Sequence, residues 1–159
     1  MAILEKVDKL HQAVAWQGDI PVTSRYTAGI AGEKFFREIK DNARILGTHC
    51  ESCGLIYVPA VMFCERCFAE LDEWLEVPSR GEVFTYTLLH RDLDEQPLDP
   101  PALLAYVKLD GATGGLVHYL GETEWEHVHV GMPVEVVFKP PAEREGSILD
   151  IRYFRPVAG

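Results

Sequence analysis

Two short segments decide how this chain folds: Cys50-Glu-Ser-Cys53-Gly54 and, ten residues further on, Cys64-Glu-Arg-Cys67. Each Cys-x-x-Cys pair can form a turn that aims two sulfurs at one point. Gly54 suits such a turn because glycine adopts positive φ without steric cost. Ten residues suffice for a hairpin that brings the pairs face to face. We therefore predict one closed tetrahedral site made by Cys50, Cys53, Cys64 and Cys67, and a closed site indicates a structural role.

Zinc is the metal that we expect in this site. A tetrahedral site of four sulfurs also suits iron, but nothing else in the sequence suggests electron transfer. All four cysteines of the chain fall between positions 50 and 67. A secreted disulfide scaffold spreads its cysteines to close long loops, so this cluster indicates metal binding in a reducing cytoplasm. No apolar run approaches the roughly 20 residues that span a bilayer, and residues 1–6 do not resemble a secretory signal.

The net charge of −10 argues against binding to nucleic acid, which draws most of its affinity from Lys and Arg at phosphates. Residues 1–45 carry seven Lys or Arg against six Asp or Glu. Residues 46–77 carry one against six, and residues 78–159 carry seven against thirteen. The second and third segments would therefore repel phosphates. A nucleic-acid-binding ribbon and barrel module remains the alternative, because both folds serve that purpose elsewhere.

Periodicity divides the chain into three parts, which we place at residues 1–45, 46–77 and 78–159. Apolar residues at steps of three and four predict helices over residues 3–16 and 32–42 in the first part. The second part is the zinc ribbon. The third part is rich in β-branched and aromatic residues between glycine corners, which favours a small barrel of the OB type. The expected fold is thus mainly β, with N-terminal helices, a rubredoxin-like zinc ribbon and an OB-fold barrel.

About five strands are predicted in the third part. Proline is expected to break the chain over residues 97–101, and residues 127–130 are expected to extend a strand edge. The five strands are predicted at residues 81–91, 103–109, 116–120, 134–138 and 148–154.

Several polar and aromatic residues have two possible roles. His49 could be a spare metal ligand, but a surface or supporting role is favoured because four cysteines already complete the site. His127 and His129 would share one face of a strand, where an exposed polar face is favoured over a metal site. The aromatic residues Phe84, Tyr86 and Tyr106 fit a barrel core slightly better than a stacking platform.

No set of residues suggests an autonomous enzyme. The sequence has no G-x-S-x-G, P-loop or G-x-G-x-x-G motif and no cysteine left over as a nucleophile. The carboxylates of Asp92, Asp94, Glu95 and Asp99 cluster in a proline-bounded loop. Such a loop is poor support for a general acid and base pair, which must be held rigidly. A solvated loop is the favoured reading.

Over residues 30–155 the chain resembles the DUF35 family, in which a rubredoxin-like zinc ribbon is joined to an OB-fold domain. The two cysteine pairs are common to many ribbons, but their combination with the other motifs is much more specific. The motifs that carry the resemblance are Lys34-Phe-Phe-Arg-Glu38, the two cysteine pairs with Gly54, Val58-Pro59, Trp74, Gly81-Glu-Val-Phe-Thr-Tyr-Thr87 and Val130-Gly-Met-Pro-Val-Glu-Val136.

The resemblance implies a non-catalytic accessory subunit that docks on a thiolase-fold protein in a hetero-oligomer and helps to hold a coenzyme A thioester. The nucleophilic cysteine would then belong to the partner. Family members also serve acyl-CoA hydratase and aldolase partners, which is the alternative assignment. Residues 1–30 are similar to the corresponding part of the small subunit of benzylsuccinate-pathway thiolases, which cleave benzoylsuccinyl-CoA.

Two departures from the family limit what can be carried over. The acidic-glycine turn is here Asp110-Gly-Ala-Thr-Gly-Gly115, which would alter the shape of that loop. The chain also lacks an obvious basic cluster for the phosphates of coenzyme A. The candidates for phosphate contact are Arg66, Arg80 and Arg91, each of which could equally have a structural or surface role.

Overall fold

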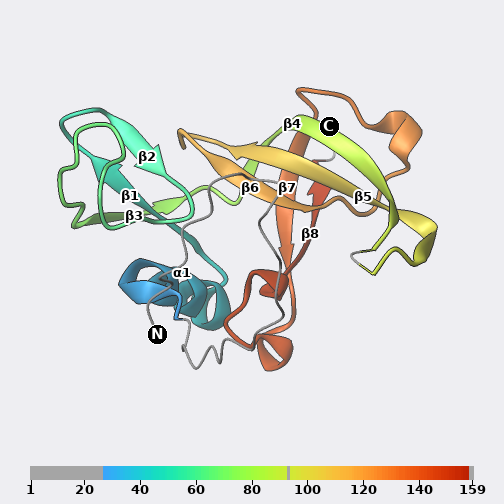
Figure 1. Ribbon diagram of the computed structural model, residues 1–159, viewed down its shortest axis with the longest axis horizontal. Coiled ribbons are helices and arrows are strands. Elements are labelled where there is room, and N and C mark those ends of the chain that lie inside the picture. The colour runs from blue at the N-terminus through green and yellow to red at the C-terminus, as the bar shows by residue number, and fades with distance from the viewer. Residues whose placement is uncertain (1–26, 93, 158–159) are drawn as a thin grey trace, which may run out of the picture.

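The computed structural model describes residues 27–92 and 94–157, which form one helix and two β-sheets (Figure 1). The helix predicted over residues 3–16 lies outside the described residues. The ribbon and the barrel lie at opposite ends of the molecule, and the helix lies beside both (Figure 1). The elements in chain order are α1 (Gly29–Asn42), β1 (Ile45–Cys50), β2 (Leu55–Tyr57), β3 (Glu73–Val77), β4 (Arg80–Arg91), β5 (Pro97–Leu109), β6 (Gly115–Tyr119), β7 (Pro133–Phe138) and β8 (Ile151–Pro156).

Helix α1 confirms the helix predicted over residues 32–42 and begins three residues earlier, at Gly29. Phe35 and Ile39 are fully buried and lie one turn apart, so one face of the helix packs on the core. The helix ends at Ala43, which adopts a left-handed conformation at φ 51° and donates its amide to the carbonyl of Ile39 (3.2 Å). Arg44 then bonds back to the Glu38 carboxylate at 2.6 Å and fixes the exit of the chain.

The barrel is a five-stranded sheet in the order β6-β5-β4-β7-β8, in which every neighbouring pair is antiparallel. A parallel bridge between Leu120 and Phe154 joins the two edges, and the amide of Gly121 donates to the carbonyl of Phe154 at 2.9 Å. This closure is what makes the sheet an OB-type barrel. Gly81 is needed on β4, because a Cβ atom there would lie 2.1 Å from the carbonyl oxygen of Lys108 on β5.

One predicted break is wrong, because strand β5 runs through the prolines from Pro97 to Leu109. Strand β6 pairs with β5 only from Leu104 to Lys108, so the first part of β5 pairs with β4 alone. Proline lacks the amide that a central strand must donate, but it is tolerated where one edge of the strand has no neighbour.

Two predicted strands also differ from the structure. Residues 127–130 form no strand edge: Trp125–His127 is a 3-10 turn, and the ring of His129 contacts the carbonyl of His127 at 3.2 Å. The last strand begins three residues later than predicted, because Ile148–Asp150 forms another 3-10 turn. The buried carboxylate of Asp150 accepts three backbone amides from the preceding loop and stabilises this turn.

The larger of two apolar clusters in the described residues links the helix, the ribbon and the barrel. It contains Phe35 of α1, Ile45 and Val77 of the ribbon, and Val83 and Phe154 of the barrel. The boundaries at residues 45/46 and 77/78 stay predictions, but the buried side chains on either side of them pack together. In the described part of the chain, no helix has the length and apolar character that a membrane crossing requires.

Candidate metal centre

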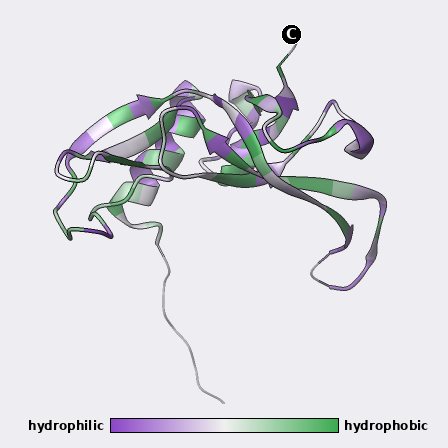
Figure 2. Cartoon of the chain, turned by 90° about the horizontal axis from the view of Figure 1, so that it is seen from above, coloured by the Kyte–Doolittle hydropathy of each residue, from purple (hydrophilic) through white to green (hydrophobic). Residues whose placement is uncertain are grey.

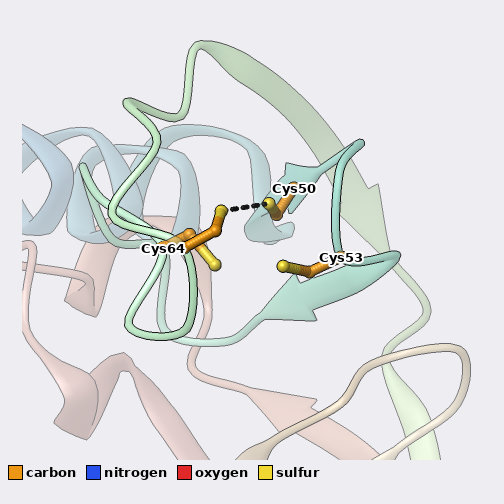
Figure 3. A group of neighbouring side chains, drawn as sticks. Cys50, Cys53 and Cys64 are labelled. Carbon is orange, nitrogen blue, oxygen red and sulfur yellow. Dashed lines mark hydrogen bonds between the residues drawn. The ribbon is translucent and has the colours of Figure 1, made fainter.

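The four cysteine sulfurs converge as the spacing predicted. All four lie within 4.8 Å of one another, and the sulfurs of Cys50 and Cys67 are 3.5 Å apart. Figure 3 shows Cys50 at the end of β1, Cys53 in the turn before β2 and Cys64 on the loop opposite, with their side chains directed into one space. A tetrahedral ion with bonds to sulfur of about 2.3 Å requires sulfurs about 3.8 Å apart. The arrangement therefore fits a four-coordinate zinc or iron ion.

Backbone hydrogen bonds shape both turns in the same way. In the first, the amides of Cys53 and Gly54 donate to the carbonyl of Cys50 at 3.2 and 2.7 Å. In the second, the amide of Phe68 donates to the carbonyl of Cys64 at 2.8 Å. The residue after each pair has positive φ, 65° at Gly54 and 60° at Phe68. The second turn thus places a bulky side chain where the first has glycine.

The thiols of Cys53 and Cys64 differ in their hydrogen bonding and therefore in their pKa values. The Tyr57 hydroxyl lies 3.2 Å from the sulfur of Cys64, and this hydrogen bond lowers the pKa of the Cys64 thiol to about 6 against the opposing effect of burial. The same contact raises the pKa of Tyr57 to about 12. Contact with the Cys67 thiol, with burial, raises the pKa of Cys53 to about 12. Four crowded thiols resist losing their protons together, whereas a bound divalent cation supplies the charge that deprotonates them.

Two supporting contacts around the site were not predicted from the sequence. Tyr57 is one, although it lies on the strand that follows the first cysteine pair, where an alternating side chain can face the sulfurs. Thr48 is the other: its buried hydroxyl donates to the carbonyl of Val61 at 2.9 Å and accepts the amide of Val61 at 3.0 Å. These two bonds fix the start of the loop that carries the second cysteine pair.

His49 has the surface role that the sequence favoured. Its Nδ1 atom lies 2.7 Å from a carboxylate oxygen of Glu73 on the neighbouring strand β3. The ring therefore contacts a carboxylate on the ribbon's surface rather than joining the four sulfurs.

The three arginines proposed for coenzyme A are not brought together. Arg66 is exposed between the second pair of cysteines. Arg80 begins β4 and lies 3.5 Å from the carboxylate of Glu135, whereas Arg91 ends the same strand and donates to the carbonyl of Glu95 at 2.7 Å. Their assignment to coenzyme A stays a prediction.

Outward-facing aromatic residues correct the core interpretation of the barrel aromatics. Phe84 is 57% exposed and Tyr86 is 37% exposed, and Phe84 lies at a bulge of β4 directly after the buried Val83. The ring of Phe84 stacks edge-on against Tyr106 with centroids 5.8 Å apart.

The acidic loop after β4 is organised by Asp92, whose carboxylate accepts the amides of Asp94 and Gln96 at 2.9 and 2.8 Å.

Comparison with known proteins agrees with this two-part architecture. The model for the ChsH2 rubredoxin-like zinc ribbon domain matches residues 37–72, and the model for the ChsH2 C-terminal OB-fold domain matches residues 74–139. A DUF35 domain-containing scaffold protein of Methanocaldococcus jannaschii is 32% identical over 131 residues, which cover 77% of this chain and 88% of the relative. A second DUF35 domain-containing scaffold protein, from Methanothermobacter thermautotrophicus, is 24% identical over 76% of this chain and 92% of its own.

Two solved structures share the fold. A DUF35 protein of unknown function from Sulfolobus solfataricus superposes with a TM-score of 0.59 at 28% identity, over 80% of this chain and 84% of its own. An Ltp2–ChsH2(DUF35) aldolase contains a chain that superposes with a TM-score of 0.61 at 23% identity, over 83% and 98% of the two chains. With its ribbon of four cysteines and its OB-type barrel, this chain belongs to the DUF35 family.

Proposed function

We propose that this chain is a non-catalytic accessory subunit that docks on a thiolase-fold protein and helps to hold a coenzyme A thioester. The observation that carries the proposal is the convergence of all four cysteines of the chain on one closed site. Thiolase chemistry needs a free thiolate to attack a thioester. With every cysteine at the metal centre, that nucleophile must come from a partner. The scaffold role named for two relatives supports the same assignment.

The metal centre serves this role as a structural element. We assign Cys50, Cys53, Cys64 and Cys67 as the ligands of one zinc ion, with Tyr57 donating to the sulfur of Cys64. Four protein ligands complete the coordination of zinc, so the ion would hold the ribbon in shape rather than activate water or substrate.

The most specific form of the proposal is that the partner is a benzylsuccinate-pathway thiolase acting on benzoylsuccinyl-CoA. Its support is the similarity of residues 1–30, most of which lie outside the described part of the chain. A second candidate partner is an acyl-CoA aldolase or hydratase. The two family models that carry the ChsH2 name support it, as does the shared fold with a chain of the Ltp2–ChsH2(DUF35) aldolase.

The coenzyme A part of the proposal rests on Arg66, Arg80 and Arg91. Arg80 and Arg91 lie at opposite ends of the 12-residue strand β4, so they would contact different parts of a ligand or different ligands. Replacing each arginine in turn by alanine and measuring the affinity of the assembled complex for coenzyme A separates them. Replacing an arginine that contacts a phosphate should lower the affinity, and replacing a surface arginine should leave the affinity unchanged.

Co-expression with the thiolase-fold proteins of its own organism tests the proposal. The expected result is co-elution in size-exclusion chromatography and release of coenzyme A only by the assembled complex. Full turnover by the isolated chain would contradict the accessory role. A salt-sensitive shift of nucleic acid in a gel would instead favour the alternative of a nucleic-acid-binding module.

A further inference from the structure

Phe68 stands out among the exposed side chains of the ribbon. It follows directly on Cys67, adopts a left-handed backbone conformation at φ 60°, and is 81% exposed. The same position of the first cysteine pair is taken by Gly54 at φ 65°. A bulky residue with positive φ is uncommon, because its Cβ atom crowds the backbone.

Backbone hydrogen bonds on both sides of Phe68 hold this conformation, and none of them needs an aromatic side chain. The amide of Phe68 donates to the carbonyl of Cys64, but any residue other than proline can make that bond. The ring buries little surface in this chain, so it contributes little to its stability. Strained residues persist where the surrounding structure or a function retains them.

A second exposed aromatic residue lies on the same loop. Phe63 is 59% exposed and forms a backbone bridge with Glu70. It comes just before the second cysteine pair, as Phe68 comes just after it. We propose that Phe68, together with Phe63 on the same loop, is the anchor by which the ribbon inserts into an apolar pocket on the partner subunit. This inference rests on the proposed function, and it names the surface that the thiolase-fold partner contacts. Exposed aromatic anchors of this kind dominate the energy of many protein interfaces.

Charge indicates what surrounds the pocket on the partner. Glu65 and Glu70 are exposed on the same loop as the two phenylalanines. Arg66 is the one Lys or Arg in residues 46–77, whose net charge is −5 from one Arg and six acids. A pocket rimmed by Lys or Arg complements this surface. A second copy of this chain does not, because two acidic ribbons would face one another.

Two substitutions separate the ring from the backbone. In Phe68→Gly, the ring is lost and the backbone strain is relieved. In Phe68→Ala, the ring is lost but the strain remains. We expect Phe68→Gly to raise the thermal midpoint of the isolated, metal-loaded chain by about 2 to 4 °C, and Phe68→Ala to leave it nearly unchanged. A variant that gains stability while losing binding cannot be explained by misfolding.

Binding is measured with the thiolase-fold partner of the same organism in the assembled complex. We expect both Phe68 substitutions to raise the dissociation constant of the complex at least tenfold. The matched control is Trp125→Ala, which removes a 52% exposed aromatic residue from the barrel and should leave the affinity unchanged. Equal affinity of Phe68→Gly and the unaltered chain would overturn the inference while leaving the proposed function intact.

Two further outcomes are decisive. If the unaltered chain forms no complex with the thiolase-fold protein, both the proposed function and this inference fail. If light scattering shows that the isolated chain is a dimer and that Phe68→Gly is a monomer, the anchor binds a second copy and the assignment to a basic-rimmed partner is wrong.

Discussion

Thr113 and Ile56, which lie 57 residues apart in the chain, exchange two hydrogen bonds across the junction of barrel and ribbon. The amide of Thr113 donates to the carbonyl of Ile56 at 2.8 Å, and the amide of Ile56 donates to the Thr113 hydroxyl at 3.0 Å. Gly114 follows, and a Cβ atom there would lie 3.1 Å from the carbonyl oxygen of Val58. The loop that departs from the family pattern therefore helps to fix how the ribbon sits on the barrel.

Replacing Thr113 by valine should test this junction. Valine keeps the shape of threonine but cannot accept the amide of Ile56, so we expect a loss of about 0.5 to 1.5 kcal/mol in the free energy of unfolding. Thr113→Ser keeps the hydroxyl and serves as the control. Denaturant unfolding monitored by tryptophan fluorescence provides the measurement, and equal stability of the two variants would show that the hydroxyl contributes nothing.

Removal of the metal should unfold the ribbon. Cys64→Ser takes away one sulfur ligand and the partner of the Tyr57 hydroxyl, and structural zinc contributes on the order of 10 kcal/mol in small zinc modules. We expect elemental analysis to find no zinc in the variant and partner binding to be lost with it. Ser52→Ala, within the first cysteine pair, is the control that should retain one zinc per chain. A folded variant that still assembles into an active complex would show that the ribbon is dispensable.

The buried carboxylate of Asp150 should make the chain sensitive to strong acid. Burial alone would raise the pKa of Asp150, but amides donated by Glu145, Gly146 and Ser147 outweigh it and lower the pKa below its ordinary value. A lowered pKa means that the unfolded state takes up the proton first. The stabilisation is thus complete above a pH of about 4 and is lost as the pH falls through the lower folded pKa.

Asp150→Asn checks this assignment. The variant keeps the size of the side chain but replaces a charged acceptor, so we expect it to unfold about 1 to 3 kcal/mol more easily at neutral pH. The difference from the unaltered chain should shrink below pH 4. Asp110→Asn, at an exposed carboxylate, is the control. A constant difference at every pH would argue against a role for the charge.

Buried His118 should make the stability fall at a milder pH. It is 5% exposed, its Nε2 atom lies 3.3 Å from the carbonyl of Ile148, and its Nδ1 atom has no hydrogen-bond partner among the described residues. Burial lowers the pKa of His118, against a smaller opposing effect of the Ile148 carbonyl. The unfolded state is therefore protonated first, and stability is lost as the pH falls from about 6.5 towards the lower folded pKa.

His118→Gln removes the titrating group and keeps a donor for Ile148. Thermal midpoints measured between pH 7.5 and 5 should fall less steeply in this variant than in the unaltered chain. His90→Gln, at an exposed histidine, should follow the unaltered chain. If His118→Gln and the unaltered chain fall in parallel, another group causes the acid sensitivity.

Sequence spacing was sufficient for the metal centre and for most of the elements around it. Two Cys-x-x-Cys pairs with ten residues between them form local turns, and a hairpin brings such turns together whatever surrounds it. Helix α1 also follows from local periodicity, because it buries one face against the core, and strand β4 follows from its β-branched and aromatic residues. The motifs of the DUF35 family, read along the same stretches, indicated both folds and their order.

Local patterns were insufficient where the outcome depends on a neighbouring strand. Pro97 and Pro101 predict a break between two strands, yet both lie in β5. The strand tolerates them because only one of its edges is paired there. Phe84 is predicted to be a core residue, yet it lies at a bulge of β4 and is 57% exposed. Register and edge exposure are properties of the assembled sheet, so a single strand does not encode them.

The sequence by itself determined the ribbon, the order of the two folds and the four converging sulfurs, since these depend on turns and spacings within short stretches. Only the tertiary structure decided which side chains surround that centre and which face outward. Tyr57 reaches Cys64, Thr113 reaches Ile56, and the ring of Phe68 is left exposed. These contacts and exposures arise when distant segments pack on a common core, and packing is a property of the whole chain.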